Sequence, residues 1–300
     1  MQKISLGNNK LINWIIFIVL SFIWGSSFIL IKEGLVGLTG YQVASVRIIS
    51  SGVSLLPIAI FVFKSIPKSK IILVFISGVL GSFLPAYFFC VAEERIDSSL
   101  AGTLNALTPV FVIIMGALFF NMNTDRNKIL GIAVSFAGSF LLYFAQPVFY
   151  KISTATDVLL IIAATLCYGI NLNLVGKFLK DIPSLNIVSV ALSLNAIPAS
   201  IILYYSGYFQ QDIFAKKILI PTGYTILLGV GSTAAATIIF YMLIKRSGVV
   251  FSSMVTYAIP VVAIFWGIIY GETVGWKQIA CLFIILSGVF IANRSRKNVV

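Results

Sequence analysis

Arg47 is the residue of this chain whose type and position most directly suggest binding chemistry. It lies about six residues inside an apolar segment, hence about 9 Å below the helix end at a rise of 1.5 Å per residue. A charge at the centre of a bilayer costs at least about 2.5 to 3.5 kcal/mol, so it needs a partner or water. Two interpretations stay open: a guanidinium that snorkels outward or braces helix ends, and an anchor for an anionic group such as a carboxylate.

Polar residues also interrupt other apolar segments. The stretch Trp24-Gly25-Ser26-Ser27 combines an indole ring, small residues and hydroxyls, which suits either close helix packing or contact with a solute. Asn171 and Asn173 lie within one turn of a further segment. Two amides facing lipid would be costly, so we expect this helix face to point into the protein.

Polar residues stand near a proline in four segments, as Asn105 and Thr108 do before Pro109. Proline removes a helix hydrogen bond and frees a carbonyl, which produces either a plain kink or a place in a wet cavity. Repetition in four segments favours a shared cavity. The candidate solute-binding residues are Trp24, Ser26, Ser27, Arg47, Tyr87, Asn105, Tyr168, Asn171, Thr256 and Tyr257.

Metal and nucleophile chemistry is not favoured by the residue types present. The chain has no histidine, and its three cysteines, Cys90, Cys167 and Cys281, lie far apart in apolar segments. This pattern argues against a disulfide framework, a zinc site or a histidine-based catalytic centre. We therefore expect no metal, no cofactor and no catalytic residues.

The composition indicates that these residues belong to a membrane protein. Hydrophobic residues make up 59% and charged residues 10% of the 300 residues, whereas soluble chains average about 25% charged residues. No stretch between the apolar segments is long enough to bury a core of its own, so no appended soluble or nucleic-acid-binding domain is expected. The first apolar run, 11–31, is too long for a signal peptide and should remain as a transmembrane helix.

Ten apolar segments match the length of about 20 residues that a helix needs to cross a bilayer. They cover residues 11–31, 41–63, 71–91, 99–120, 128–145, 157–178, 185–205, 222–244, 249–270 and 276–293. Most of the connections are short, which predicts an antiparallel bundle. The expected fold class is an all-α membrane protein with ten transmembrane helices.

The distribution of charge predicts the orientation of these helices. With the N-terminus inside, the inner segments hold fourteen of the 21 Lys and Arg residues and the outer segments six. Of the nine acids, two fall inside and seven outside. Cytoplasmic loops retain cations, so we expect both termini in the cytoplasm and a multi-pass location in the cytoplasmic (inner) membrane.

The second half of the chain repeats features of the first half. The equivalent positions are Trp24 and Tyr168 at an offset of 144, Gly81 and Gly231, Met122 and Glu272, and Gly138 and Gly288 at 150, and Pro109 and Pro260 at 151. Chance similarity between apolar helices is the alternative explanation. Five segments in each half would give the second copy an inverted topology, the basis of alternating access. The predicted repeats are residues 1–147 and 148–300.

Several stretches resemble the signatures of a known family. They are Phe22-Ile23-Trp24-Gly25-Ser26-Ser27-Phe28, Val46-Arg47, Thr108-Pro109-Val110-Phe111, and Gly271-Glu272 followed by Gln278 and Gly288. In order and spacing they look like the drug/metabolite transporter superfamily, specifically its EamA-type members. The chain departs from the family pattern at Met122, where Glu is frequent, and at Ala92-Glu93-Glu94-Arg95, which replaces an Ala-Leu-Lys-like ending.

The resemblance implies ten helices in two inverted five-helix repeats, a solute site in a central cavity, and export or exchange of small metabolites. We therefore expect a carrier of small organic metabolites, such as amino acids or related amphiphiles, whose partners are the metabolite and the bilayer. A membrane channel and a membrane-embedded lipid-modifying enzyme are the alternatives. All acids fall at helix ends or in loops, which favours facilitated efflux or exchange over a proton antiporter. The oligomeric state stays open.

Overall fold

The computed structural model describes residues 10–96, 98–123, 125–145, 155–269 and 275–293, and every regular element in these ranges is a helix. Six helical spans there are long and apolar enough to cross a membrane. Shorter apolar helices lie in three of the other predicted segments, at Thr108–Phe119, Val249–Val262 and Ile279–Ala292. The predicted boundary at 147 and 148 and the pair Gly271-Glu272 lie outside the described residues. The all-helical class and the membrane assignment are therefore confirmed.

The first half of the chain begins with two long helices and continues with shorter ones. Its elements are α1 (Lys10–Leu35), α2 (Gly40–Val62), η1 (Phe63–Ser65), η2 (Lys68–Lys70), α3 (Ile71–Gly78), the π-helix η3 (Val79–Phe83), α4 (Leu84–Ala92), α5 (Ser98–Asn105), α6 (Thr108–Phe119) and α7 (Arg126–Ala145).

The second half follows the same order of long and broken helices. Its elements are α8 (Ala155–Phe178), α9 (Ser184–Tyr205), η4 (Tyr208–Gln210), α10 (Lys216–Leu227), the π-helix η5 (Leu228–Ala235), α11 (Ala236–Ser247), α12 (Val249–Ser253), α13 (Val255–Ile269) and α14 (Trp276–Asn293).

Four of the predicted segments are not continuous α-helices. The segment 99–120 breaks between Asn105 and Thr108, because Pro109 has no N–H with which to continue the helix. The segment 249–270 breaks at Met254. The segments 71–91 and 222–244 each contain a π-helical turn, which frees backbone carbonyls in mid-helix and is frequent at functional sites.

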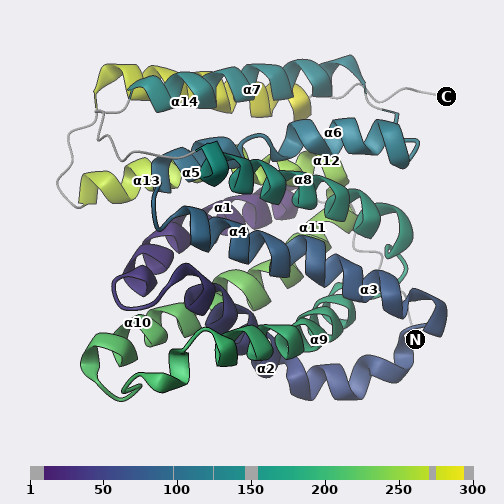
Figure 1. Cartoon of the computed structure of the whole chain (residues 1–300). Helices are drawn as coiled ribbons and strands as arrows, with labels where there is room; N and C mark the ends of the chain where they lie inside the picture. The colour runs from purple at the N-terminus through teal and green to yellow at the C-terminus, as the bar shows by residue number, and fades with distance from the viewer. Residues whose placement is uncertain (1–9, 97, 124, 146–154, 270–274, 294–300) are drawn as a thin grey trace.

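Two antiparallel helix pairs form opposite edges of the bundle (Figure 1). At one edge α7 packs along α14, where the Ser135 hydroxyl donates to the Ile285 carbonyl at 3.0 Å. At the other edge α2 packs along α9, where the Ser193 hydroxyl donates to the Gly52 carbonyl at 3.0 Å. Helices α1, α4, α8 and α11 lie between these pairs. The middle helices therefore hold the residues furthest from lipid.

The helices of the middle layer approach one another closely at two glycines. A Cβ on Gly25 of α1 would lie 2.6 Å from Val262 of α13, and a Cβ on Gly169 of α8 would lie 2.8 Å from Phe111 of α6. Any larger side chain would push these helices apart. The outer surface is apolar, with Phe61 85% and Tyr205 81% exposed, as expected of a surface that faces acyl chains.

Candidate functional site

Arg47 is positioned by a well-defined start of α2. Thr39 and Gln42 form a capping box, in which the Thr39 side chain accepts from the Gln42 N–H and the Gln42 side chain accepts from the Thr39 N–H. This cap sets the rotation of α2, so that Arg47, two turns later, points at η5. There its Nε donates to the Thr233 hydroxyl at 2.7 Å.

The Arg47 guanidinium has polar neighbours but forms no ion pair with an acid in the described part of the chain. The buried Cys90 thiol of α4 and the Tyr168 hydroxyl of α8 both lie within electrostatic range of it. The carboxylates found in ion pairs there are Asp181 and Asp157, and both pair with other cations. The charge of Arg47 therefore has no fixed counter-ion among the described residues.

The π-helix η5 explains why three elements meet at this point. A π-turn leaves carbonyls without their usual partners, and side chains satisfy two of them here. The Trp24 indole Nε1 donates to the Ser232 carbonyl at 2.9 Å, and the Thr233 hydroxyl donates to the Leu228 carbonyl at 3.4 Å. Trp24 and Arg47 thus contact consecutive residues of η5. We call Trp24, Arg47, Cys90, Tyr168 and Thr233 the Arg47 cluster.

Aromatic rings border this cluster. The ring of Tyr168 stacks on Phe89 of α4, with centroids 6.3 Å apart. The ring of Trp24 meets Phe240 of α11 edge to face, with centroids 4.8 Å apart. Rings from α1, α4, α8 and α11 therefore surround the Arg47 cluster.

Tyr87 and Asn171 lie one helical turn from members of the Arg47 cluster. The Tyr87 hydroxyl shares a hydrogen bond of 2.7 Å with Ser45 of α2. The Asn171 amide donates to the Tyr241 hydroxyl of α11 at 2.9 Å, and its buried carbonyl oxygen has no donor among the described residues. Both side chains are therefore turned into the bundle, and Asn171 offers one unused acceptor.

The other amide of α8 also points inward. Asn173 is 3% exposed and donates to the Val112 carbonyl of α6 and to the Gly169 carbonyl, each at 2.9 Å. Asn171 is 1% exposed. The amide face of α8 thus avoids lipid, in agreement with the energetic cost of exposing it.

Five of the ten predicted site residues form hydrogen bonds that do not reach the side chains of the Arg47 cluster. Ser26 and Ser27 donate to carbonyls of their own helix, Phe22 at 2.8 Å and Trp24 at 2.6 Å. Asn105 accepts from Thr108 at 3.2 Å, next to the break between α5 and α6. These groups satisfy local backbone and side-chain partners.

Thr256 and Tyr257 belong to the same group. The Thr256 hydroxyl donates to the Ser253 carbonyl at 3.0 Å. The fully buried Tyr257 donates to the Ile132 carbonyl of α7 at 3.2 Å, so its hydroxyl joins two helices. Its contact indicates a packing role.

Sequence reasoning did not identify Thr233, Cys90 and Tyr241. Their only sequence signal is a polar or sulfur-containing side chain inside an apolar segment, which is too common to select them.

Two acids are also more deeply buried than expected: Glu93 is 6% and Asp157 0% exposed, although both stand at helix ends. Among the described residues, no three His, Cys, Asp or Glu side chains gather as metal ligands.

A shallow groove of about 360 Å³ lies elsewhere, on the surface between α2 and α9. Its lining includes Leu56 on α2, Phe63 at the start of η1, and residues from Val190 to Ser200 on α9, and it is mostly apolar. None of the predicted site residues lines it. The groove is therefore separate from the Arg47 cluster.

Comparison with known proteins gives a consistent result. A transporter of Archaeoglobus fulgidus, described as uncharacterized, is 25% identical over 284 residues, which cover 94% of this chain and 99% of that protein. A "probable amino-acid metabolite efflux pump" of Salmonella typhimurium is 24% identical over 276 residues, 90% of each chain. These relatives are named as transporters and not as enzymes.

The fold also occurs in a solved structure. A crystal structure superposes with a TM-score of 0.70 at 15% identity, covering 93% of this chain and 96% of the other. The model of the EamA-like transporter family matches residues 12–144 and again residues 156–294. The two matches together span nearly the whole chain. The protein is therefore a multi-pass membrane transporter that belongs to the EamA-like transporter family.

Proposed function

We propose that this protein is an alternating-access carrier that exports or exchanges small organic metabolites bearing a carboxylate, such as amino acids or related amphiphiles. The observation that carries the proposal is Arg47, a half-buried guanidinium with no acidic partner in the described part of the bundle. Thr233 occupies its Nε, which leaves the terminal nitrogens to bind a carboxylate through two parallel hydrogen bonds.

The rings around Arg47 supply the apolar part of the proposed site. Trp24, Phe89 and Tyr168 offer flat faces to a hydrocarbon or aromatic portion of the solute. The unused carbonyl oxygen of Asn171, one turn along α8, provides an acceptor for a donor group. An anion at one point and apolar surface around it suit an amphiphilic solute.

Ten transmembrane helices in two inverted five-helix repeats, residues 1–147 and 148–300, are part of this proposal. Gly25 packs against Val262, and Gly169 packs against Phe111. The two contacts are equivalent, because Gly169 follows Gly25 by 144 residues and Val262 follows Phe111 by 151. The π-helices η3 and η5 also overlap when shifted by 150 residues. Such equivalences support two copies of one unit, which can pack in two alternative ways.

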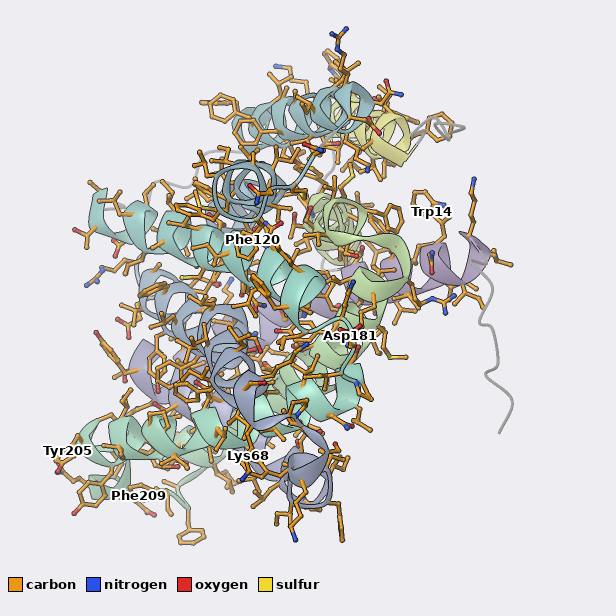
Figure 2. The ribbon with its side chains drawn as sticks, turned by 90° about the vertical axis from the view of Figure 1, so that its right-hand side faces the viewer. Trp14, Lys68, Phe120, Asp181, Tyr205 and Phe209 are labelled. Carbon is orange, nitrogen blue, oxygen red and sulfur yellow. The ribbon has the colours of Figure 1, made fainter. Side chains whose placement is uncertain are left out.

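We further propose that both termini face the cytoplasm. Lys68 and Asp181 lie with Trp14 at the end of the bundle that faces the viewer in Figure 2. Lys64, Lys70, Lys177 and Lys245 belong to helix ends of the same topological side. An excess of Lys over acids supports a cytoplasmic location for that end.

The test is counterflow of labelled carboxylate-bearing metabolites in proteoliposomes. Arg47→Gln is expected to lower the initial rate at least tenfold for every transported anion, and Arg47→Lys to restore part of it. The control is Arg126→Gln, which removes an equal charge from an exposed position at the start of α7 and should leave the rate unchanged. Unchanged counterflow in Arg47→Gln would refute the anchor role.

The same assay separates a carrier from a channel. A carrier preloaded with unlabelled solute accumulates labelled solute transiently, whereas a channel only equilibrates it. Absence of such an overshoot for every solute that crosses the membrane would reject alternating access.

A further inference from the structure

Two arginine side chains make the same kind of contact at two places in the bundle. Arg95, just after the end of α4, donates from Nε to Asp157 Oδ1 at 3.0 Å in the first turn of α8. Arg246, in the last turn of α11, donates from Nε to Asn13 Oδ1 at 2.9 Å in the first turn of α1. In each case the end of a π-containing segment is tied to the start of a long helix.

The two contacts occupy equivalent positions of the internal repeat. Arg246 follows Arg95 by 151 residues, the offset between Pro109 and Pro260. Asp157 follows Asn13 by 144 residues, the offset between Trp24 and Tyr168. The same donor atom, the same type of acceptor atom and nearly the same distance recur, so one contact is present in two copies.

The Arg246–Asn13 and Arg95–Asp157 contacts lie at opposite ends of α1. Asn13 is in its first turn. Arg95 follows Glu94, whose carboxylate accepts from the N–H of Gly40, shortly after α1 ends at Leu35. A helix of 26 residues is about 39 Å long at 1.5 Å per residue, which is enough to cross a bilayer. The two contacts are therefore on opposite faces of the membrane.

The two copies differ in charge. Asp157 is a fully buried carboxylate, so the contact with Arg95 is an ion pair. Asn13 is a buried neutral amide, and Nη2 of Arg246 is buried without an acceptor among the described residues. Both contacts use a cationic guanidinium, but only Arg95 also meets an anionic acceptor, so its contact gains the attraction between opposite charges that a contact with a neutral amide lacks. The closure at the Asp157 end is therefore the stronger one.

We infer that Arg95–Asp157 and Arg246–Asn13 are the two gates of the transport cycle, and that their unequal strength makes the empty carrier open preferentially at the Asn13 end. The inference rests on the proposed function, since a gate has meaning only for alternating access. With both termini in the cytoplasm, the weaker gate faces the cytoplasm. An exporter then rests in the state that can load its solute.

Cys90 provides a reporter for both gates. It is buried next to Arg47, so a membrane-impermeant maleimide reaches it only through a pathway opened from one side. The protein for this test carries Cys167→Ala and Cys281→Ala, which leaves Cys90 as the only thiol. The readout is the ratio of labelling rates from the cytoplasmic and the external face in oriented vesicles, without any solute.

Asp157→Asn is expected to raise external labelling of Cys90 at least threefold. Asn13→Asp gives Arg246 a carboxylate for both of its nitrogens and should lower cytoplasmic labelling at least threefold. The double variant should reverse the preferred side. Since Asn13→Asp adds a contact, it tests the inference even if Asp157→Asn folds poorly.

Asp181→Asn is the matched control. Asp181 pairs with Lys70 at 3.8 Å and its side chain is 71% exposed, so its loss should leave the ratio unchanged. A ratio that neither gate variant alters would overturn the gate assignment. If Asp157→Asn raised labelling from the cytoplasmic face, or Asn13→Asp lowered labelling from the external face, the assignment of a resting state open to the cytoplasm would be overturned. The labelling needs no solute, so loss of counterflow in Arg47→Gln cannot be mistaken for either result.

Discussion

The two ends of this bundle are built on equivalent positions but are closed by different chemistry. At the Asp157 end, Arg95 and Asp157 form an ion pair, and the buried cluster nearby holds Ile96, Ala101 and Ile161 together with Phe89. At the Asn13 end, a hydrogen bond from Arg246 to a neutral amide lies close in sequence to three aromatic rings. These are Trp14, Phe17 and Phe251, whose centroids are 5.3 to 5.5 Å apart.

The difference shows how one repeated unit can acquire direction. A charge pair depends on geometry and on the surrounding salt, whereas contact between rings depends mainly on buried area. Phe17 and Ile161 are themselves equivalent, 144 residues apart. Substitution at a few paired positions is therefore enough to make two similar ends close with different strength.

The largest expected effect on the stability of the whole fold comes from removing the aromatic packing near Asn13, which is separate from the polar contact of the gate. Phe17 is 4% exposed, and Phe17→Ala should lower the free energy of unfolding in detergent by about 3 kcal/mol, because it leaves a cavity between α1 and α12. The equivalent Ile161→Ala should lower it by about 2 kcal/mol, since fewer atoms are lost. Denaturant titrations of both variants measure the difference. A larger loss for Ile161→Ala would contradict the comparison.

The next effect concerns the two arginines. Arg95→Gln removes the ion pair of the buried Asp157 with Arg95 and should destabilise the protein by about 2 kcal/mol, a value reduced because the Arg95 side chain is half exposed. Arg246→Gln keeps a donor for Asn13 and removes a buried nitrogen that lacks an acceptor, so its cost should stay below about 1 kcal/mol. Thermal unfolding of the two variants side by side checks the order, and equal shifts would argue against unequal gates.

The smallest effect is a response to salt. Raising the ionic strength from about 0.15 M to about 1 M shortens the Debye length from about 8 Å to about 3 Å and weakens the half-exposed Arg95–Asp157 pair. External labelling of Cys90 should then rise about twofold, while cytoplasmic labelling stays constant. Potassium chloride added equally to both sides provides the measurement, with Asp157→Asn as the control that has lost the response. Equal salt effects on both faces would contradict the difference in charge.

Much of the fold could be predicted from the sequence because lipid imposes a simple length and polarity rule. The apolar segments 11–31, 157–178 and 185–205 nearly coincide with α1, α8 and α9. The inward face of α8 follows from the cost of exposing Asn171 and Asn173. The π-turns η3 and η5 were not predictable, since hydropathy averages over a whole turn and does not register one extra residue in it.

The candidate site was only partly predictable. Trp24, Arg47 and Tyr168 are unusual residues for apolar segments, and the structure brings them together around η5 and α4. Ser26 and Thr256 looked equally suitable, but a hydroxyl in a helix can bond to its own backbone, and both do so. The direction of a single hydroxyl depends on local rotamers that residue type does not reveal.

By itself the sequence determined that this chain is helical, lies in a membrane and contains related halves, because the required length, polarity and offsets are one-dimensional properties. Only the tertiary structure decided which residues meet across the bundle. Arg95 and Asp157 are 62 residues apart, and Asn13 and Arg246 are 233 residues apart. Such pairs depend on the rotation and relative position of helices that are distant along the chain, which packing sets and composition does not.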